Sequence, residues 1–173
     1  MDAKKHTFSN IEQFLETQLD RVNYWLSFAE AKNGILLGVN IAIIAVLINM
    51  FNVAPILCTI CILFLLISSL CSILSFIPNL GKASKKDTTF INDNVNLIYY
   101  ADIALFENYE QYLNSVKKRY FSNTTINSVM ELDFAEEIVI NSKICIKKYK
   151  RFDQAIKVDV ISVILIAIFF VIA

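Results

Sequence analysis

The chain has 173 residues, of which 56% are hydrophobic, and its 16 basic and 16 acidic side chains give a net charge of zero. This length excludes a multidomain enzyme, and the absence of net charge gives no electrostatic reason to expect nucleic acid as a partner. The hydrophobic fraction exceeds that of an ordinary soluble domain. The composition therefore predicts a mainly α-helical integral membrane protein.

Charged residues are distributed unevenly, and their pattern predicts where the chain crosses the membrane. No Lys, Arg, Asp or Glu occurs from Asn33 to Gly81, and none follows Asp159. The apolar runs in these regions are each about 20 residues long, enough for a helix to cross a hydrocarbon core of ~30 Å. The three predicted transmembrane helices cover residues 33–51, 56–77 and 156–173.

The remaining segments are predicted to be long helical extensions of these spans that form a small cytoplasmic domain. Residues 1–32 contain an amphipathic helix that should continue into the first span and give one helix of about 40 residues. Residues 81–155 are predicted to be a cytoplasmic ligand-sensing segment. Within it, residues 96–120 fit either one helix or a short extended piece followed by a helix, and residues 128–152 should run unbroken into the third span.

The positions of the basic residues predict the orientation of the chain. All 16 Lys and Arg lie before Gly34 or between Lys82 and Lys157. The positive-inside rule therefore places the N-terminus and the segment 81–155 in the cytoplasm, and the C-terminus outside.

Small and polar residues in the first span predict close contacts between helices. Gly34, Gly38 and Ala42 recur at every fourth position, and small residues at this spacing let helix backbones approach closely in lipid. Two partners fit the stripe, a second subunit of a homo-oligomer or the second span of the same chain. Asn40 is costly in hydrocarbon unless its amide finds a partner, which favours an interhelical hydrogen bond over a pore-lining role.

The sequence offers little for catalysis or metal binding. It has a single histidine, and three of its four cysteines, Cys58, Cys61 and Cys71, lie in the second predicted span, where they pack as small apolar residues. No zinc-protease, nucleophile-elbow, P-loop or dinucleotide-binding motif occurs. We therefore expect no enzyme activity, no catalytic residue, no metal and no cofactor.

The cytoplasmic segment instead combines aromatic, amide and cationic side chains near the membrane. A small anionic ligand with a flat ring needs a cation for its phosphate, an aromatic face for its base, and amides or acids for its polar edges. Lysines beside a span also have a simpler role, which is to hold the headgroups of the cytoplasmic leaflet. The residues concerned are Tyr99, Tyr100, Tyr109, Tyr112, Tyr120, Tyr149, Lys117, Lys118, Arg119, Lys148 and Arg151.

Four blocks of sequence, taken in order, resemble a known family. They are "RVNYWLSFAEAKNGILLGVN", "FIPNL", "NLIYYADIALFENYEQYL" and "ELDFAEEIVINSKICIKKYKRF", the last followed by an apolar span. Together they resemble the transmembrane effector family of the Pycsar anti-phage systems, over nearly the whole chain. The positions that match the family pattern are Phe28, Ala29, Glu30, Lys32, Leu36, Leu37, Tyr99, Tyr100, Asp102, Ala135, Glu136, Ile138, Asn141, Ser142, Lys143, Lys148 and Tyr149. Ile41 departs from it, because the family has a small residue after the Asn.

The resemblance implies an antiviral defence effector that is a multi-pass protein of the bacterial inner membrane. A partner nucleotide cyclase makes 3′,5′-cyclic UMP or cyclic CMP during infection, and the cytoplasmic part of the effector binds it. The membrane part, as a homo-oligomer, then impairs the lipid bilayer and causes growth arrest or abortive infection. Apart from the bilayer, the implied partner is this cyclic nucleotide, and no nucleic acid is involved.

Two segments are candidates for the ligand site. On the stem before the third span, Lys148 would hold a phosphate, Tyr149 would stack on a pyrimidine and Asn141 would read a base edge. The other candidate is the segment from Tyr99 to Asp102. The full set of candidate ligand-binding residues is Tyr99, Asp102, Asn141, Lys143, Lys148, Tyr149 and Arg151.

Two other classes of function remain open on the residues alone. One is a holin-like or superinfection-exclusion membrane protein that acts without a ligand, and the other is a structural anchor for a cytosolic partner. The first does not need a cytoplasmic segment with several tyrosines. The second does not need Asn40 or a stripe of small residues within the membrane.

Overall fold

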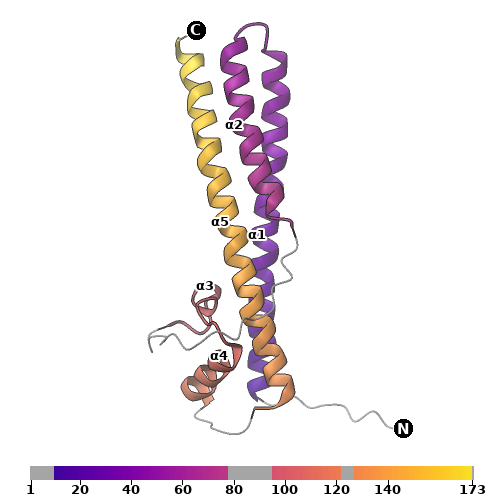
Figure 1. Cartoon of the computed structure of the whole chain (residues 1–173), viewed down its shortest axis with the longest axis vertical. Helices are drawn as coiled ribbons and strands as arrows, with labels where there is room; N and C mark the ends of the chain where they lie inside the picture. The colour runs from indigo at the N-terminus through magenta and orange to yellow at the C-terminus, as the bar shows by residue number, and fades with distance from the viewer. Residues whose placement is uncertain (1–9, 78–94, 122–126, 173) are drawn as a thin grey trace, which may run out of the picture. The chain divides into compact units, whose positions relative to one another are not determined.

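The structure is a computed structural model that describes residues 10–77, 95–121 and 127–172, with side chains as far as residue 168. The described residues form helices and turns, and the two long helices expected from the sequence are confirmed (Figure 1). The helices are α1 (Asn10–Asn49), α2 (Pro55–Leu74), α3 (Tyr100–Ile103), α4 (Tyr109–Val116), the π-helix η1 (Lys117–Phe121) and α5 (Val129–Ile172).

The chain divides into two compact units, and α1 and α5 contribute to both. The head unit comprises the described residues of the ranges 1–26 and 79–146. The bundle unit comprises those of the ranges 27–78 and 147–173. Neither α1 nor α5 is interrupted where it passes from one unit to the other.

The head unit has a hydrophobic core formed by one face of α1, one face of α5 and the short helices. Tyr112 is fully buried in this core, and its hydroxyl donates a hydrogen bond to the Leu97 carbonyl oxygen at 3.2 Å. Burial raises the pKa of Tyr112 above its usual range, so the phenol stays protonated and remains a donor. The buried residues of this core are Ile11, Leu15, Val22, Leu97, Ile103, Phe106, Tyr112, Leu113, Val116, Ala135, Ile138 and Val139.

Residues 96–120 form neither of the arrangements predicted for them. The one-turn helix α3 stops at Ile103, and α4 starts again at Tyr109 before passing into η1. The interruption has a local cause, because Asn108 adopts an extended conformation and its side chain accepts a hydrogen bond from the Glu110 amide at 2.8 Å. An Asn in this position caps a new helix rather than continuing an old one.

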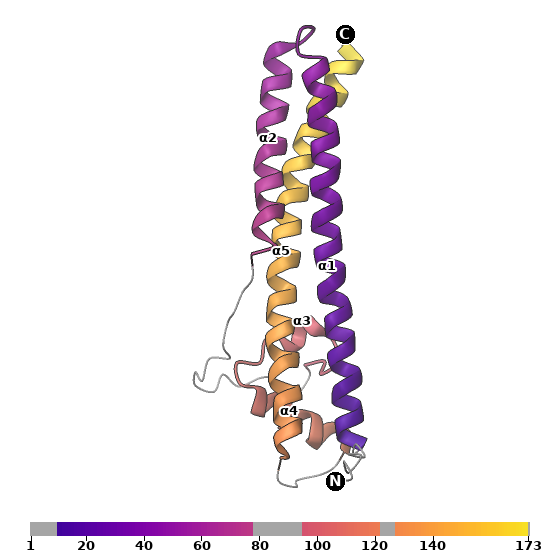
Figure 2. The same ribbon diagram turned by 90° about the vertical axis from the view of Figure 1, so that its right-hand side faces the viewer.

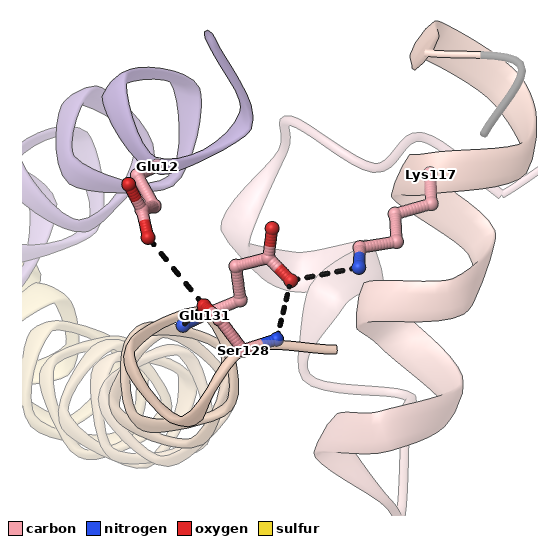
Figure 3. Close-up of polar contacts among 4 residues, drawn as sticks. All are labelled: Glu12, Lys117, Ser128 and Glu131. Atoms are coloured by element: carbon pink, nitrogen blue, oxygen red, sulfur yellow. Dashed lines mark hydrogen bonds and ion pairs between the residues drawn. The ribbon is translucent and has the colours of Figure 1, made fainter. Parts of the chain in front are cut away.

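The start of α5 is fixed by a reciprocal cap (Figure 3). The Ser128 amide donates to the Glu131 carboxylate at 3.0 Å, and the Glu131 amide donates to the Ser128 hydroxyl oxygen at 3.1 Å. This pair is a capping box, which satisfies two amides that the first turn would otherwise leave without partners. The same carboxylate binds the Lys117 ammonium at 2.7 Å, and the Ser128 hydroxyl donates to Glu12 at 3.4 Å. The cap therefore joins α5 to η1 and to α1.

In the bundle unit, α2 runs beside the second part of α1 and the last part of α5 in both views (Figures 1 and 2). The first half of α2 makes apolar contacts with the end of α1, and the buried residues there are Leu47, Cys58, Cys61 and Leu65. Large apolar residues also cover the outer surface of the bundle unit, which suits contact with lipid chains. Examples are Ile35, Ile48, Ile56, Leu63, Leu70 and Val163, each more than half exposed.

Two helices, not the predicted three, are long and apolar enough to cross a membrane among the residues whose side chains are described. They are α1 and α2. The third predicted span is not among them because its last residues, 169–173, lie outside the described side chains. The part that remains carries Lys157 and Asp159, and at about 1.5 Å per residue it is shorter than a ~30 Å hydrocarbon core.

Candidate functional site

The candidate ligand-binding residues are divided between the two units. Four of them, Tyr99, Asp102, Asn141 and Lys143, belong to the head unit. The other three, which are Lys148, Tyr149 and Arg151, belong to the bundle unit.

The head unit gathers four aromatic side chains from two distant segments. The Tyr99 and Tyr100 rings lie 4.8 Å apart between centroids, and Tyr100 lies 5.7 Å from Trp25. Trp25 in turn meets Tyr24 edge-to-face at 5.7 Å. Tyr99 is 46% exposed and Trp25 is 39% exposed, so the cluster offers aromatic surface to solvent. We call these four residues the aromatic cluster.

A hydrogen-bonded turn presents the tyrosines of this cluster. The Asn96 side-chain oxygen accepts hydrogen bonds from the amides of Ile98, at 2.9 Å, and Tyr99, at 3.3 Å. The backbone N–H of Asn96 donates to the Asp102 carboxylate at 2.9 Å. Asp102 therefore has a positioning role in the turn. Arg119 fixes the start of the same segment, since its guanidinium donates to the Val95 carbonyl oxygen at 2.5 Å.

The sequence analysis missed the α1 half of this cluster. Trp25 and Tyr24 lie about 75 positions before the tyrosines they join, and in α1 they read as ordinary residues of an amphipathic helix. The signal in the sequence that points to them is their position in the block "RVNYWLSFAEAK", which carries part of the family resemblance. Their role depends on tertiary packing, which helical periodicity does not report.

The two stem residues of the head unit make structural contacts. The Asn141 amide donates to the Asn23 side-chain oxygen at 2.9 Å, which links α5 to α1. The Lys143 ammonium donates to the Glu107 carbonyl oxygen at 3.4 Å. These bonds do not test whether either residue also contacts a ligand, so both stay predictions.

Lys148 joins all three helices of the bundle unit. Its ammonium donates to the Ser75 carbonyl oxygen at 2.8 Å and lies 3.0 Å from the Glu30 carboxylate. Its own carbonyl oxygen accepts a hydrogen bond from the Asn33 amide at 3.3 Å. Only 9% of the residue is exposed. This geometry shows a structural role for Lys148, at the end of α2.

Tyr149 and Arg151 have different surroundings. The Lys32 ammonium lies 5.4 Å from the Tyr149 ring centroid, 4.8 Å from that of Phe28 and 5.4 Å from that of Phe152. These distances are typical of cation–π contacts. Arg151 is exposed.

The small-residue stripe of the first span faces outward for most of its length. A Cβ atom added at Gly38 would meet nothing within 4 Å, and Ala42 is exposed. At Gly34 it would lie 3.8 Å from the Phe76 ring, which is an ordinary contact. Asn40 points the other way, and its amide donates to the Ser68 hydroxyl oxygen at 2.9 Å. The interhelical hydrogen bond expected for Asn40 is therefore present.

The sequence of the chain matches one known protein family over both units. The family model described as the Pycsar effector protein domain matches residues 14–173, almost the whole chain and parts of both units. No curated protein and no solved structure matches the chain. The match confirms the resemblance drawn from the sequence and indicates an anti-phage defence effector with a membrane location, from a family associated with cyclic nucleotide signalling. The chain belongs to the Pycsar effector family.

Proposed function

We propose that the chain binds a 3′,5′-cyclic pyrimidine nucleotide, cyclic UMP or cyclic CMP, through its head unit. The partner cyclase supplies this ligand, and the bundle unit then impairs the bacterial inner membrane, which causes growth arrest or abortive infection. The chain acts without catalysing a reaction of its own. The observation that carries the proposal is the continuity of α1 and α5, since each helix belongs to the head and to the bundle.

The aromatic cluster supports a ligand site in the head unit. Stacking of a base on an aromatic side chain is worth about 1–3 kcal/mol and does not require a particular base. Tyr99 and Trp25 both expose ring surface, and the Asn96–Asp102 turn holds one of them in place before a ligand arrives. A site organised in advance loses less entropy on binding. Arg119, bonded to the start of this turn, is the nearest candidate in the same segment for holding the phosphate.

The register of the bundle supports a third membrane crossing by α5. The hydrogen bond from Asn33 to the Lys148 carbonyl oxygen aligns Lys148 with the start of the first predicted span. From Lys148 to Ile172 the helix is about 36 Å long, enough for a ~30 Å core. With the basic residues on the cytoplasmic side, the N-terminus is cytoplasmic and the C-terminus is outside.

The open side of the small-residue stripe supports a homo-oligomer. Gly38 has no neighbour within 4 Å of an added Cβ atom, so the packing of this chain alone does not require a glycine there. In lipid, small residues at this spacing are typical of helix–helix contacts. A second copy of α1 is therefore the partner that we propose for Gly38 and Ala42.

The ligand site is tested by the fluorescence of Trp25, the single tryptophan of the chain. Detergent-solubilised protein is titrated with cyclic UMP, cyclic CMP and cyclic AMP. A pyrimidine nucleotide that stacks on the aromatic cluster should change the emission of Trp25 and saturate. The Tyr99→Leu variant should bind about 5- to 150-fold more weakly, because it loses one stacking contact.

The matched control is Tyr120→Leu, which removes an exposed tyrosine of the same unit that packs on Phe14 instead. It should leave the titration unchanged. Release of a dye from liposomes, with and without the nucleotide, tests the membrane step. Dye release that does not depend on any nucleotide would favour the holin-like alternative, and equal binding of all three nucleotides would contradict recognition of pyrimidines.

A further inference from the structure

Asp159 is a buried acid in the bundle unit, and the functions described above do not use it. Only 6% of the residue is exposed, and neither carboxylate oxygen has a hydrogen-bond partner. The carboxyl group lies beside the side chains of Ser68 and Asn40, without completing a hydrogen bond to either. The three residues come from α5, α2 and α1, so the acid lies among all three helices.

The depth of Asp159 makes an uncompensated charge costly. The helix places it about 16 Å beyond Lys148, which is itself aligned with the start of the first predicted span. Its neighbour Asn40 lies seven residues, or about 10 Å, into the first predicted span, so the acid lies within a ~30 Å hydrocarbon core, where a charged side chain is expensive and needs a partner. The third predicted span starts at residue 156, which puts Asp159 close to its start, because the sequence does not show how α5 aligns with α1.

The basic residues described in the bundle unit near this level do not neutralise the acid. The Lys157 ammonium binds the Asp153 carboxylate at 2.6 Å on the exposed side of α5. The Lys148 ammonium binds Glu30 and the Ser75 carbonyl oxygen. The elements packed against Asp159 present Asn40 from α1 and Ser68 from α2, which are both neutral.

Two further buried hydroxyl groups without hydrogen bonds lie one helical turn away from Asp159 and Ser68. The hydroxyl of Ser162, one turn further along α5, is fully buried and makes no hydrogen bond, and the same is true of Ser72, one turn further along α2. Figure 2 shows that α2 runs antiparallel to α5, so one turn further along each helix leads in opposite directions from the acid. The Asn40 amide already donates to Ser68, which leaves its carbonyl side for another contact.

We propose that Asp159, Asn40 and Ser68 bind one alkali-metal cation between the three helices. A single carboxylate with neutral amide and hydroxyl oxygens is a hard ligand set, and it supplies one negative charge for one positive charge. The described residues contain no group of three His, Cys, Asp or Glu side chains that would suit a divalent or transition metal. The bound ion neutralises Asp159 and holds α1, α2 and α5 together. This inference rests on the proposed function only in taking α5 as a membrane crossing.

The test measures the melting temperature of the full-length protein in detergent, with no nucleotide present. A thiol-reactive dye reports unfolding, because Cys58 and Cys61 are buried in the bundle unit. NaCl replaces N-methylglucamine chloride at constant ionic strength and pH. For a dissociation constant of about 10 mM, 150 mM Na⁺ should raise the melting temperature by about 3–6 °C.

Variants separate ion binding from a structural role. Asp159→Asn should abolish the sodium response and should melt no lower than the wild type does in N-methylglucamine, because it removes the charge that needed the ion. Ser68→Ala should shift the response to higher Na⁺. Asp153→Asn, which removes an exposed acid from the same helix, should keep the full response.

Three results would overturn the proposal. The first is a wild-type melting temperature that does not differ between Na⁺ and N-methylglucamine. The second is a sodium response that survives in Asp159→Asn. The third is a melting temperature that depends on Asp159 through pH but not through Na⁺, which would identify a proton as the ligand. None of these results depends on cyclic nucleotide binding, so they leave the proposed function to its own test.

Discussion

Replacement of Lys148 by Met tests whether this lysine stabilises the bundle or binds the ligand. The sequence predicts a ligand contact, whereas the structure places the ammonium on the Ser75 carbonyl oxygen and the Glu30 carboxylate. Met retains most of the aliphatic part of the lysine side chain, so the variant removes the charge and little of the packing. The expected result is a less stable protein that still binds the nucleotide.

The magnitude follows from the two contacts. A charge-assisted hydrogen bond to a buried carbonyl contributes about 1.5–3 kcal/mol. The Glu30 side chain is 47% exposed, so water screens the ion pair and its contribution is at most about 1 kcal/mol. A loss of about 3 kcal/mol should lower the melting temperature of a chain of this size by about 6–12 °C.

The assay is the thiol-dye melting curve, followed by the Trp25 titration at a temperature where the variant is folded. Lys147→Met is the matched control, because Lys147 is the exposed neighbour of Lys148 on the same helix. It should change the melting temperature by less than about 1 °C. An unchanged melting temperature in Lys148→Met, together with lost nucleotide binding, would refute the structural role and restore Lys148 as a ligand contact.

The remaining predictions concern the head unit, the subunit contact and a buried thiol. Glu131→Gln should destabilise the head unit by about 3–5 kcal/mol, measured by chemical denaturation, because its side chain and that of Lys117 are 9% and 3% exposed. A cost below about 1 kcal/mol would contradict a buried ion pair. Gly38→Leu should lower the mass of the complex by light scattering without lowering the melting temperature, and an unchanged mass would show that the stripe is not a subunit contact. Burial raises the pKa of Cys145 to about 12 from 9.0, so a maleimide at pH 8 should modify it on the order of a thousandfold more slowly than an exposed thiol. Because the raised pKa favours the neutral thiol in the folded state, burial of Cys145 contributes fully to the free energy of unfolding below about pH 9, and this contribution is lost as the pH rises toward 12. Denaturation should therefore give a lower free energy of unfolding at pH 10.5 than at pH 8.

The long helices and the apolar spans could be predicted because local sequence determines them. The charge-free run after Asn33 and the helical spacing in α1 required no knowledge of tertiary contacts, and the structure confirms the continuous α1 and α5. The break at Asn108 was also encoded locally, as an Asn followed two positions later by Glu110. It was missed because the apolar periodicity on either side is helical.

The candidate site was harder to predict because its residues are far apart in the chain. Trp25 meets Tyr100 only through the packing of the head unit. In the sequence, Lys148 looks like any other lysine beside a membrane span, and only the structure shows its contacts with Ser75 and Glu30. Charge distribution predicts on which side of the membrane a lysine lies. It does not predict whether the ammonium is buried.

The energetics of switching argue that several ligand sites act together. Moving an equilibrium from about 1:99 to 99:1 requires about 5.5 kcal/mol of differential binding. One stacked base contributes about 1–3 kcal/mol and one charge-assisted hydrogen bond about 1.5–3 kcal/mol, and only the part that differs between the two states counts. A single site on Tyr99 and Arg119 reaches this value only if both contacts have their largest contributions and form in one state alone, whereas subunits that switch together share the requirement among several sites. If the proposed homo-oligomer switches as a unit, membrane leakage should rise more steeply than ligand occupancy in the wild type. Gly38→Leu, which should separate the proposed subunits, should then flatten leakage toward the binding curve. Equal steepness of leakage and binding in the wild type would mean that each chain switches alone.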